Sequence, residues 1–194
     1  MKLGFPFWGK LIFILSLVVV ILGFFYFEFS LILRILVILL GLFGLGMYKR
    51  DPEILILIIL YLGLYDCYNI RYGLALPLVI ILLAVLGLSS FLFYMFAWSN
   101  QIIQNLAKER FFLYLVTAGL VILEIFLAMS FWPVDPKIKS LVIVVVFYLI
   151  SKIFYLYAHN MLNLKRTIGF IMAGIIVLIS VIVFNWWFGL KGGL

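Results

Sequence analysis

Apolar residues along the chain gather into seven long runs separated by short polar stretches. Each run has 17 to 25 residues, and about 20 apolar residues in a helix cross a hydrocarbon core of ~30 Å. The pattern therefore predicts an all-α, polytopic membrane helix bundle, with one transmembrane domain over residues 1–194. The predicted spans are 11–27, 31–48, 54–70, 74–98, 111–132, 141–158 and 168–188.

The third run is the least regular of the seven. Its unbroken part covers only Ile54 to Tyr65, and Asp66, Asn69 and Arg71 follow closely. A full crossing with Asp66 near the interface is the preferred interpretation. The alternative is a re-entrant half-helix over 54–70, which would leave six spans.

Composition supports a membrane protein and excludes a soluble one. Hydrophobic residues make up 69% of the chain and charged residues 11%, whereas soluble domains have about half and a quarter. So large an apolar fraction needs lipid as its solvent. The net charge of +7 comes from Lys and Arg at the ends of runs, where topology and anionic headgroups favour them, so we expect no nucleic-acid partner.

Basic residues set the expected orientation. Lys2 and Lys10 precede the first run, and Lys and Arg prefer the cytoplasmic side of a span. That run ends in Glu28-Phe29-Ser30 rather than a small-residue cleavage site, so we expect an uncleaved first span. The N-terminus is then cytoplasmic, and an odd number of crossings places the C-terminus on the opposite side. Basic residues divide eight to five under either interpretation of the third run, so they do not choose between seven spans and six.

Residues 99–110 have a different pattern from the runs around them. Apolar residues Ile102, Ile103, Leu106 and Ala107 fall on one helical face, with amides and charges around the rest. This pattern predicts an amphipathic helix lying in the membrane interface. The alternative is a helical extension of the fourth run into water.

One carboxylate and one cation lie deep within two neighbouring runs. Glu124 lies ~12 Å before Trp132 along its helix, and Lys152 lies ~17 Å after Leu141 on the next, antiparallel one. A lysine side chain can bridge a difference in depth of ~5 Å, so we expect an ion pair. A charge inside a membrane is costly and is commonly functional, which indicates a proton or ion relay or a polar cavity. The alternative is a buried pair that only fixes helix register.

Other polar side chains share the faces of these two residues. Tyr148, Lys152, Tyr155 and His159 recur at steps of four, three and four, which places them on one stripe of a helix. Thr117 precedes Glu124 by seven residues and so roughly shares its face. These residues form the predicted intramembrane polar cluster. Alternatively, the tyrosines are packing residues and His159 lies at the headgroups.

Signatures of catalysis and of metal binding are absent from the sequence. There is one Cys, one His, no His-Glu-x-x-His, no Gly-x-Ser-x-Gly and no phosphate-binding loop. We therefore expect no enzyme activity, cofactor or metal site. The sequence favours a non-catalytic component that holds a membrane partner, either another membrane protein or a second copy, with the lipid bilayer as its solvent. The alternative is a small transporter or channel for a solute, ion or proton that uses the Glu124–Lys152 pair.

Overall fold

The computed structural model describes residues 7–28, 30–47, 51–74 and 76–189. Within these ranges the chain forms eight helices, of which seven are long and one is a single turn. The seven long helices coincide with the seven apolar runs to within a few residues at each end. The helices are α1 (Phe7–Phe27), α2 (Leu31–Met47), α3 (Pro52–Gly73), α4 (Leu78–Ser99), α5 (Ile102–Asn105), α6 (Lys108–Ser130), α7 (Pro136–Ala158) and α8 (Leu164–Gly189).

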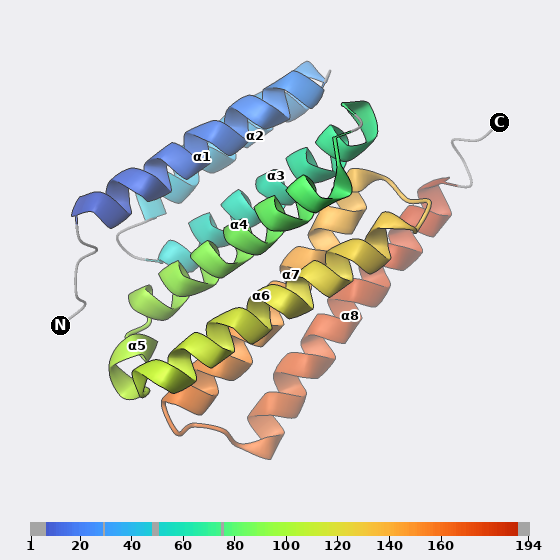
Figure 1. Cartoon of the computed structure of the whole chain (residues 1–194). Coiled ribbons are helices and arrows are strands. Elements are labelled where there is room, and N and C mark those ends of the chain that lie inside the picture. Colours follow the sequence, from blue (N-terminus) through green and yellow to red (C-terminus); the bar gives the residue numbers. More distant parts are fainter. Residues whose placement is uncertain (1–6, 29, 48–50, 75, 190–194) are drawn as a thin grey trace.

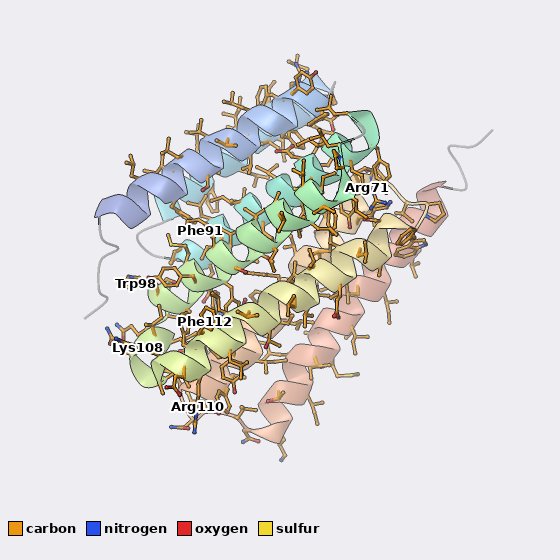
Figure 2. The ribbon with its side chains drawn as sticks, viewed as in Figure 1. Arg71, Phe91, Trp98, Lys108, Arg110 and Phe112 are labelled. Carbon is orange, nitrogen blue, oxygen red and sulfur yellow. The ribbon has the colours of Figure 1, made fainter. Side chains whose placement is uncertain are left out.

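The long helices run alternately up and down between the two ends of the bundle (Figure 1). We call the end that holds Glu28, Leu74 and residues 131–135 the hairpin end. The opposite end holds α5 and residues 159–163, and we call it the α5 end. Figure 2 shows Arg71 near the hairpin end and Lys108 and Arg110 near the α5 end. Basic residues therefore flank the apolar part of the bundle at both ends, as they do around membrane spans.

Helix α3 is the central helix of the bundle and packs against α1, α2, α4 and α7. Leu55, Ile59 and Leu60 on this helix have no exposed surface. The helix is continuous for 22 residues and has proline in its first turn, where a missing N–H costs nothing. It therefore runs from the α5 end to the hairpin end, and the half-helix considered for 54–70 is not what the structure contains.

Residues 99–110 do not form the predicted amphipathic helix, and they do not extend the fourth run either. Helix α4 ends at Ser99, and Gln101 adopts a left-handed conformation with φ of 58°. The four-residue α5 follows, and Leu106 is then extended. Ile102 is fully buried in the core rather than facing outward, so this segment makes a tight turn that packs against the core at the α5 end.

Four helices are long and apolar enough to cross a membrane by length and composition, in the part of the chain that the structure describes: α3, α4, α6 and α7. Shorter apolar stretches lie at Phe13–Phe27, Leu31–Gly46 and Thr167–Ser180, within α1, α2 and α8. Large apolar side chains such as Leu22, Ile32 and Ile176 are exposed on these outer helices. Lys2, one of the two residues on which the expected orientation rests, lies outside the described residues.

Candidate functional site

An ion pair joins α7 to the start of α3. Nζ of Lys152 lies 2.6 Å from Oε2 of Glu53, and the side chains retain 20% and 18% of their surface exposed. Glu53 is in the first turn of α3, where a carboxylate also opposes the positive end of the helix dipole. The lysine is thus neutralised by a partner at the α5 end of the bundle.

Aromatic rings surround the ammonium group of Lys152. Its Nζ lies 5.5 Å from the ring centre of Tyr148, 5.8 Å from Tyr155 and 5.9 Å from Phe96, which is the range of cation–π attraction. The predicted stripe of α7 therefore does come together around Lys152. His159 continues it, with its ring 4.3 Å from that of Tyr155 and Nδ1 3.0 Å from the Tyr155 carbonyl. The histidine lies at the C-terminal cap of α7, so it is at the bundle end rather than deep within it.

Glu124 is not part of this cluster, and the predicted Glu124–Lys152 pair does not form. Glu124 is exposed on the outer face of α6 and has no ion-pair partner among the described residues. Thr117 is exposed on the same face and donates to the Leu113 carbonyl one turn earlier, at 2.8 Å. Helix α6 turns its buried side, including Gly119 and Phe126, to the rest of the bundle, and this rotation directs Glu124 away from α7.

A second polar cluster, at the hairpin end, is centred on Glu28. Its carboxylate accepts hydrogen bonds from the Ser30 amide at 3.1 Å and from the Tyr65 hydroxyl at 3.3 Å, and Oε2 lies 2.8 Å from Nζ of Lys137. Burial on its own raises the pKa of Glu28. The Lys137 ammonium and the Ser30 N–H outweigh that effect, so the net pKa is lowered from its ordinary value. Glu28 is therefore an ionised carboxylate that ties the α1–α2 connection to α7.

Lysine also ties α7 to α3 at the hairpin end. The side chain of Lys139 is buried, and its Nζ donates to the Tyr72 hydroxyl at 3.1 Å. Tyr72 in turn donates to the Ser130 carbonyl of α6 at 2.7 Å, and Tyr68 donates to the Phe126 carbonyl at 3.1 Å. Nζ of Lys139 lies 5.0 Å from the ring centre of Tyr72. These contacts link α3, α6 and α7 at the hairpin end of the bundle.

One buried carboxyl group has no such partner. Asp66 on α3 is 7% exposed, and its Oδ1 has no hydrogen-bond partner among the described residues. Its side chain packs directly against Gly23 of α1, so closely that a Cβ at that glycine would overlap the carboxylate. Asp66 was expected at the interface, whereas the structure buries it between two helices.

Sequence reasoning missed Glu53 as the partner of Lys152 and Lys137 as the partner of Glu28. The signal that could have found both is the alternation of the helices. The start of α3 and the end of α7 share one end of the bundle, and the end of α1 and the start of α7 share the other. Lys152 lies six residues, or ~9 Å, before the end of α7, which a lysine side chain can reach across. Comparing the depth of each charged residue with the depths of those on all the other helices, rather than only on the next helix in sequence, would have pointed to these partners.

The charged side chains of both clusters are held by ion pairs, hydrogen bonds and aromatic rings. The part of the chain that the structure describes contains no group of three His, Cys, Asp or Glu residues that could hold a metal ion. The charged side chains that come together are paired or covered by rings. Comparison with known proteins adds no function: no family model, no curated protein and no solved structure matches the chain.

Proposed function

We propose that the chain crosses the membrane seven times as one transmembrane domain and holds another membrane protein against the outer face of α6, without catalysing a reaction. The observation that carries the proposal is the exposed position of Glu124 on that helix. A charged side chain near the centre of a lipid-facing helix costs about 3 kcal/mol. A partner that supplies a basic or hydrogen-bonding group at the same depth removes this cost.

The surroundings of Glu124 support a helix as the partner. Exposed residues on α6 recur at steps of three and four, which gives a stripe along the helix: Leu113, Thr117, Leu120, Glu124 and Ala128. Such spacing matches a second helix packed alongside. Glu124 lies six residues, or ~9 Å, from the end of α6, so its short side chain does not reach the headgroups from there.

Seven crossings are supported by the alternation of seven long helices between two common ends. Helices α1, α2 and α8 flank the four that are long enough by composition, and they expose apolar side chains outward. We place the N-terminus in the cytoplasm and the C-terminus on the opposite side. A compartment-sensitive reporter fused after Leu194 tests this, because a cytoplasmic signal would require an even number of crossings.

Photo-crosslinking in living cells tests the partner. A photoreactive amino acid at Leu120 or Ala128 should give discrete adducts with a second protein, and Glu124→Leu should abolish them while leaving the chain in the membrane. The matched control position is Leu39, which is equally apolar and 61% exposed, but on α2. The same adducts from Leu39, or adducts that persist in Glu124→Leu, would contradict the proposal.

A second candidate function, movement of a proton, is favoured by Asp66 alone. The group is buried and its Oδ1 lacks a partner in the described part of the chain, and buried carboxyls inside membranes commonly serve as relays. The version of this function that uses a Glu124–Lys152 pair loses its support, because Lys152 pairs with Glu53. Purified chain in liposomes with an internal pH dye decides it. A proton flux that disappears in Asp66→Asn would favour transport over the partner-holding function.

A further inference from the structure

The face of the bundle between α2 and α8 contains two neighbouring apolar cavities. The first, of ≈ 370 Å³, lies between α2, α3 and α7, and the second, of ≈ 380 Å³, lies between α3, α7 and α8. Leu57 and Val144 line both, so the two cavities adjoin each other along α3 and α7. Leu36 and Leu40 form the outer wall of the first and are 47% and 42% exposed. The cavities therefore form a groove that opens sideways toward the surrounding lipid.

The groove is at least as deep as one leaflet, and along α3 its lining extends to Ile54 in the first turn of that helix. Along α7 it begins at Lys137 and continues through Val144 to Leu149. The 12 residue steps from Lys137 to Leu149 rise ~18 Å, compared with about 15 Å for half of a ~30 Å hydrocarbon core. A chain that enters at the hairpin end thus reaches roughly the middle of the bilayer within the groove.

Two cations and one carboxylate lie at or beside the hairpin end of the groove. Lys137 lines the groove, pairs with Glu28 at 2.8 Å and has 37% of its side chain exposed. Arg34 on α2 donates from Nε to the Glu28 carbonyl at 2.6 Å, and its guanidinium lies 5.7 Å from the ring centre of Phe25. Because an ammonium has three donors and a guanidinium five, both keep N–H groups for a further acceptor.

The charge at this end leaves room for one more anion. Arg34 and Lys137 together exceed Glu28 by one positive charge. The nearby carboxylate of Asp135 accepts from the Lys137 amide at 2.7 Å as the cap of α7, and the positive helix end offsets its charge. A phosphodiester that is the single charge of its headgroup matches this excess, whereas a zwitterionic headgroup adds a cation beside two others.

We propose that the groove binds one acyl chain of an anionic phospholipid, with the phosphate against Arg34 and Lys137. The proposal requires the bundle to lie in a membrane, but it does not depend on a partner at α6, which is on another part of the surface. The chain fills the apolar groove, and the phosphate accepts hydrogen bonds from the two basic side chains where the groove meets the headgroup region.

Purified chain in lipid-free detergent tests this with phosphatidylglycerol and phosphatidylcholine of identical acyl chains. We expect native mass spectrometry to show one retained phosphatidylglycerol, and thermal unfolding to shift upward more with phosphatidylglycerol than with phosphatidylcholine. Leu40→Trp fills the groove and should abolish both effects. Leu39→Trp is the control, because it adds the same ring to the next residue of α2, which does not line the groove.

A headgroup variant tests the phosphate contact separately from the groove. Arg34→Gln should lower the affinity for phosphatidylglycerol about tenfold, as expected for a lost charged hydrogen bond, and should lower the affinity for phosphatidylcholine less. Equal stabilisation by both lipids, or stabilisation that survives Leu40→Trp, would overturn the proposal. So would a dimer in lipid-free detergent that Leu40→Trp converts to a monomer, because the groove would then hold a second copy. Crosslinking from Leu120 on α6 reports the other surface, so the two proposals fail independently.

Discussion

Nζ of Lys152 on α7 lies 2.6 Å from Oε2 of Glu53 on α3, across 99 positions of sequence. The contact joins the last third of one helix to the first turn of another, and three aromatic rings cover the ammonium group. Because each side chain is only about one-fifth exposed, removing one member strands a charge in a poorly solvated place. The Glu53–Lys152 ion pair therefore links α3 to α7 and stabilises their packing.

A double-mutant cycle should show the coupling between these two residues. We expect Lys152→Met or Glu53→Gln alone to lower the free energy of unfolding by ~2 kcal/mol. That is less than the ~3–5 kcal/mol of a fully buried pair, because some solvent contact remains. The double variant should recover much of the loss. Thermal unfolding in detergent measures all three variants.

Glu124 provides the matched control for this cycle. Combined with Lys152→Met, Glu124→Gln should give additive effects, because the two residues do not meet in the structure. Additive losses for Lys152 and Glu53 together with coupling between Lys152 and Glu124 would show that the pair predicted from depth is the real one.

The sequence predicted the helices well, because the length of an apolar run and the place of a proline are local properties. Helix α1 ends at Phe27 and α2 begins at Leu31, where the apolar runs end and begin, and Pro52 lies in the first turn of α3. The rotation of each helix about its own axis is not local. Glu124 and Lys152 lie at similar depth, yet α6 faces the bundle with Gly119 and Phe126 instead, and depth alone contains no information about that angle.

The prediction of an amphipathic helix over residues 99–110 was wrong for a related reason. Their apolar spacing fits a helix, but the left-handed Gln101 interrupts it. Burying Ile102 in the core outweighs the local pattern, which shows tertiary packing overriding a short periodic signal.

Stability should fall in acid because of Glu28. A carboxyl whose pKa is lowered on folding stabilises the folded state above its unfolded pKa, and it loses that contribution as the pH falls through the folded pKa. The loss should therefore begin near the ordinary carboxyl pKa of about 4.3 and continue below it. Melting temperatures recorded from pH 7 to pH 3 measure it. Glu28→Gln should be less stable at pH 7 and should show a shallower decline, whereas a parallel decline in both proteins would exclude Glu28 as the cause.

Thiol labelling should distinguish the tight turn at 99–110 from an interfacial helix. In a Cys67→Ser background, a cysteine at Ile102 should resist a water-soluble reagent, because that side chain is fully buried. Cysteines at the exposed positions Gln104, Ala107 and Lys108 should react. Labelling rates measured by mass spectrometry test this. Fast reaction at Ile102 would show that the segment does not pack on the core.

The contact between α1 and α3 at Gly23 and Asp66 has no room for an added methyl group. Gly23→Ala places a Cβ into the Asp66 carboxyl group, and overpacking of this kind typically costs about 1–3 kcal/mol. Asp66→Ala removes the obstructing atoms together with a buried group that lacks a partner at Oδ1, so the double variant should recover most of the loss.

The control is Gly87→Ala on α4, where a Cβ would meet no atom within 4 Å. There the change should be neutral or stabilising by up to about 1 kcal/mol. Unfolding in detergent measures all four proteins. If Gly23→Ala behaved like Gly87→Ala, α1 would not pack against α3 at this level, and the burial of Asp66 would need another cause.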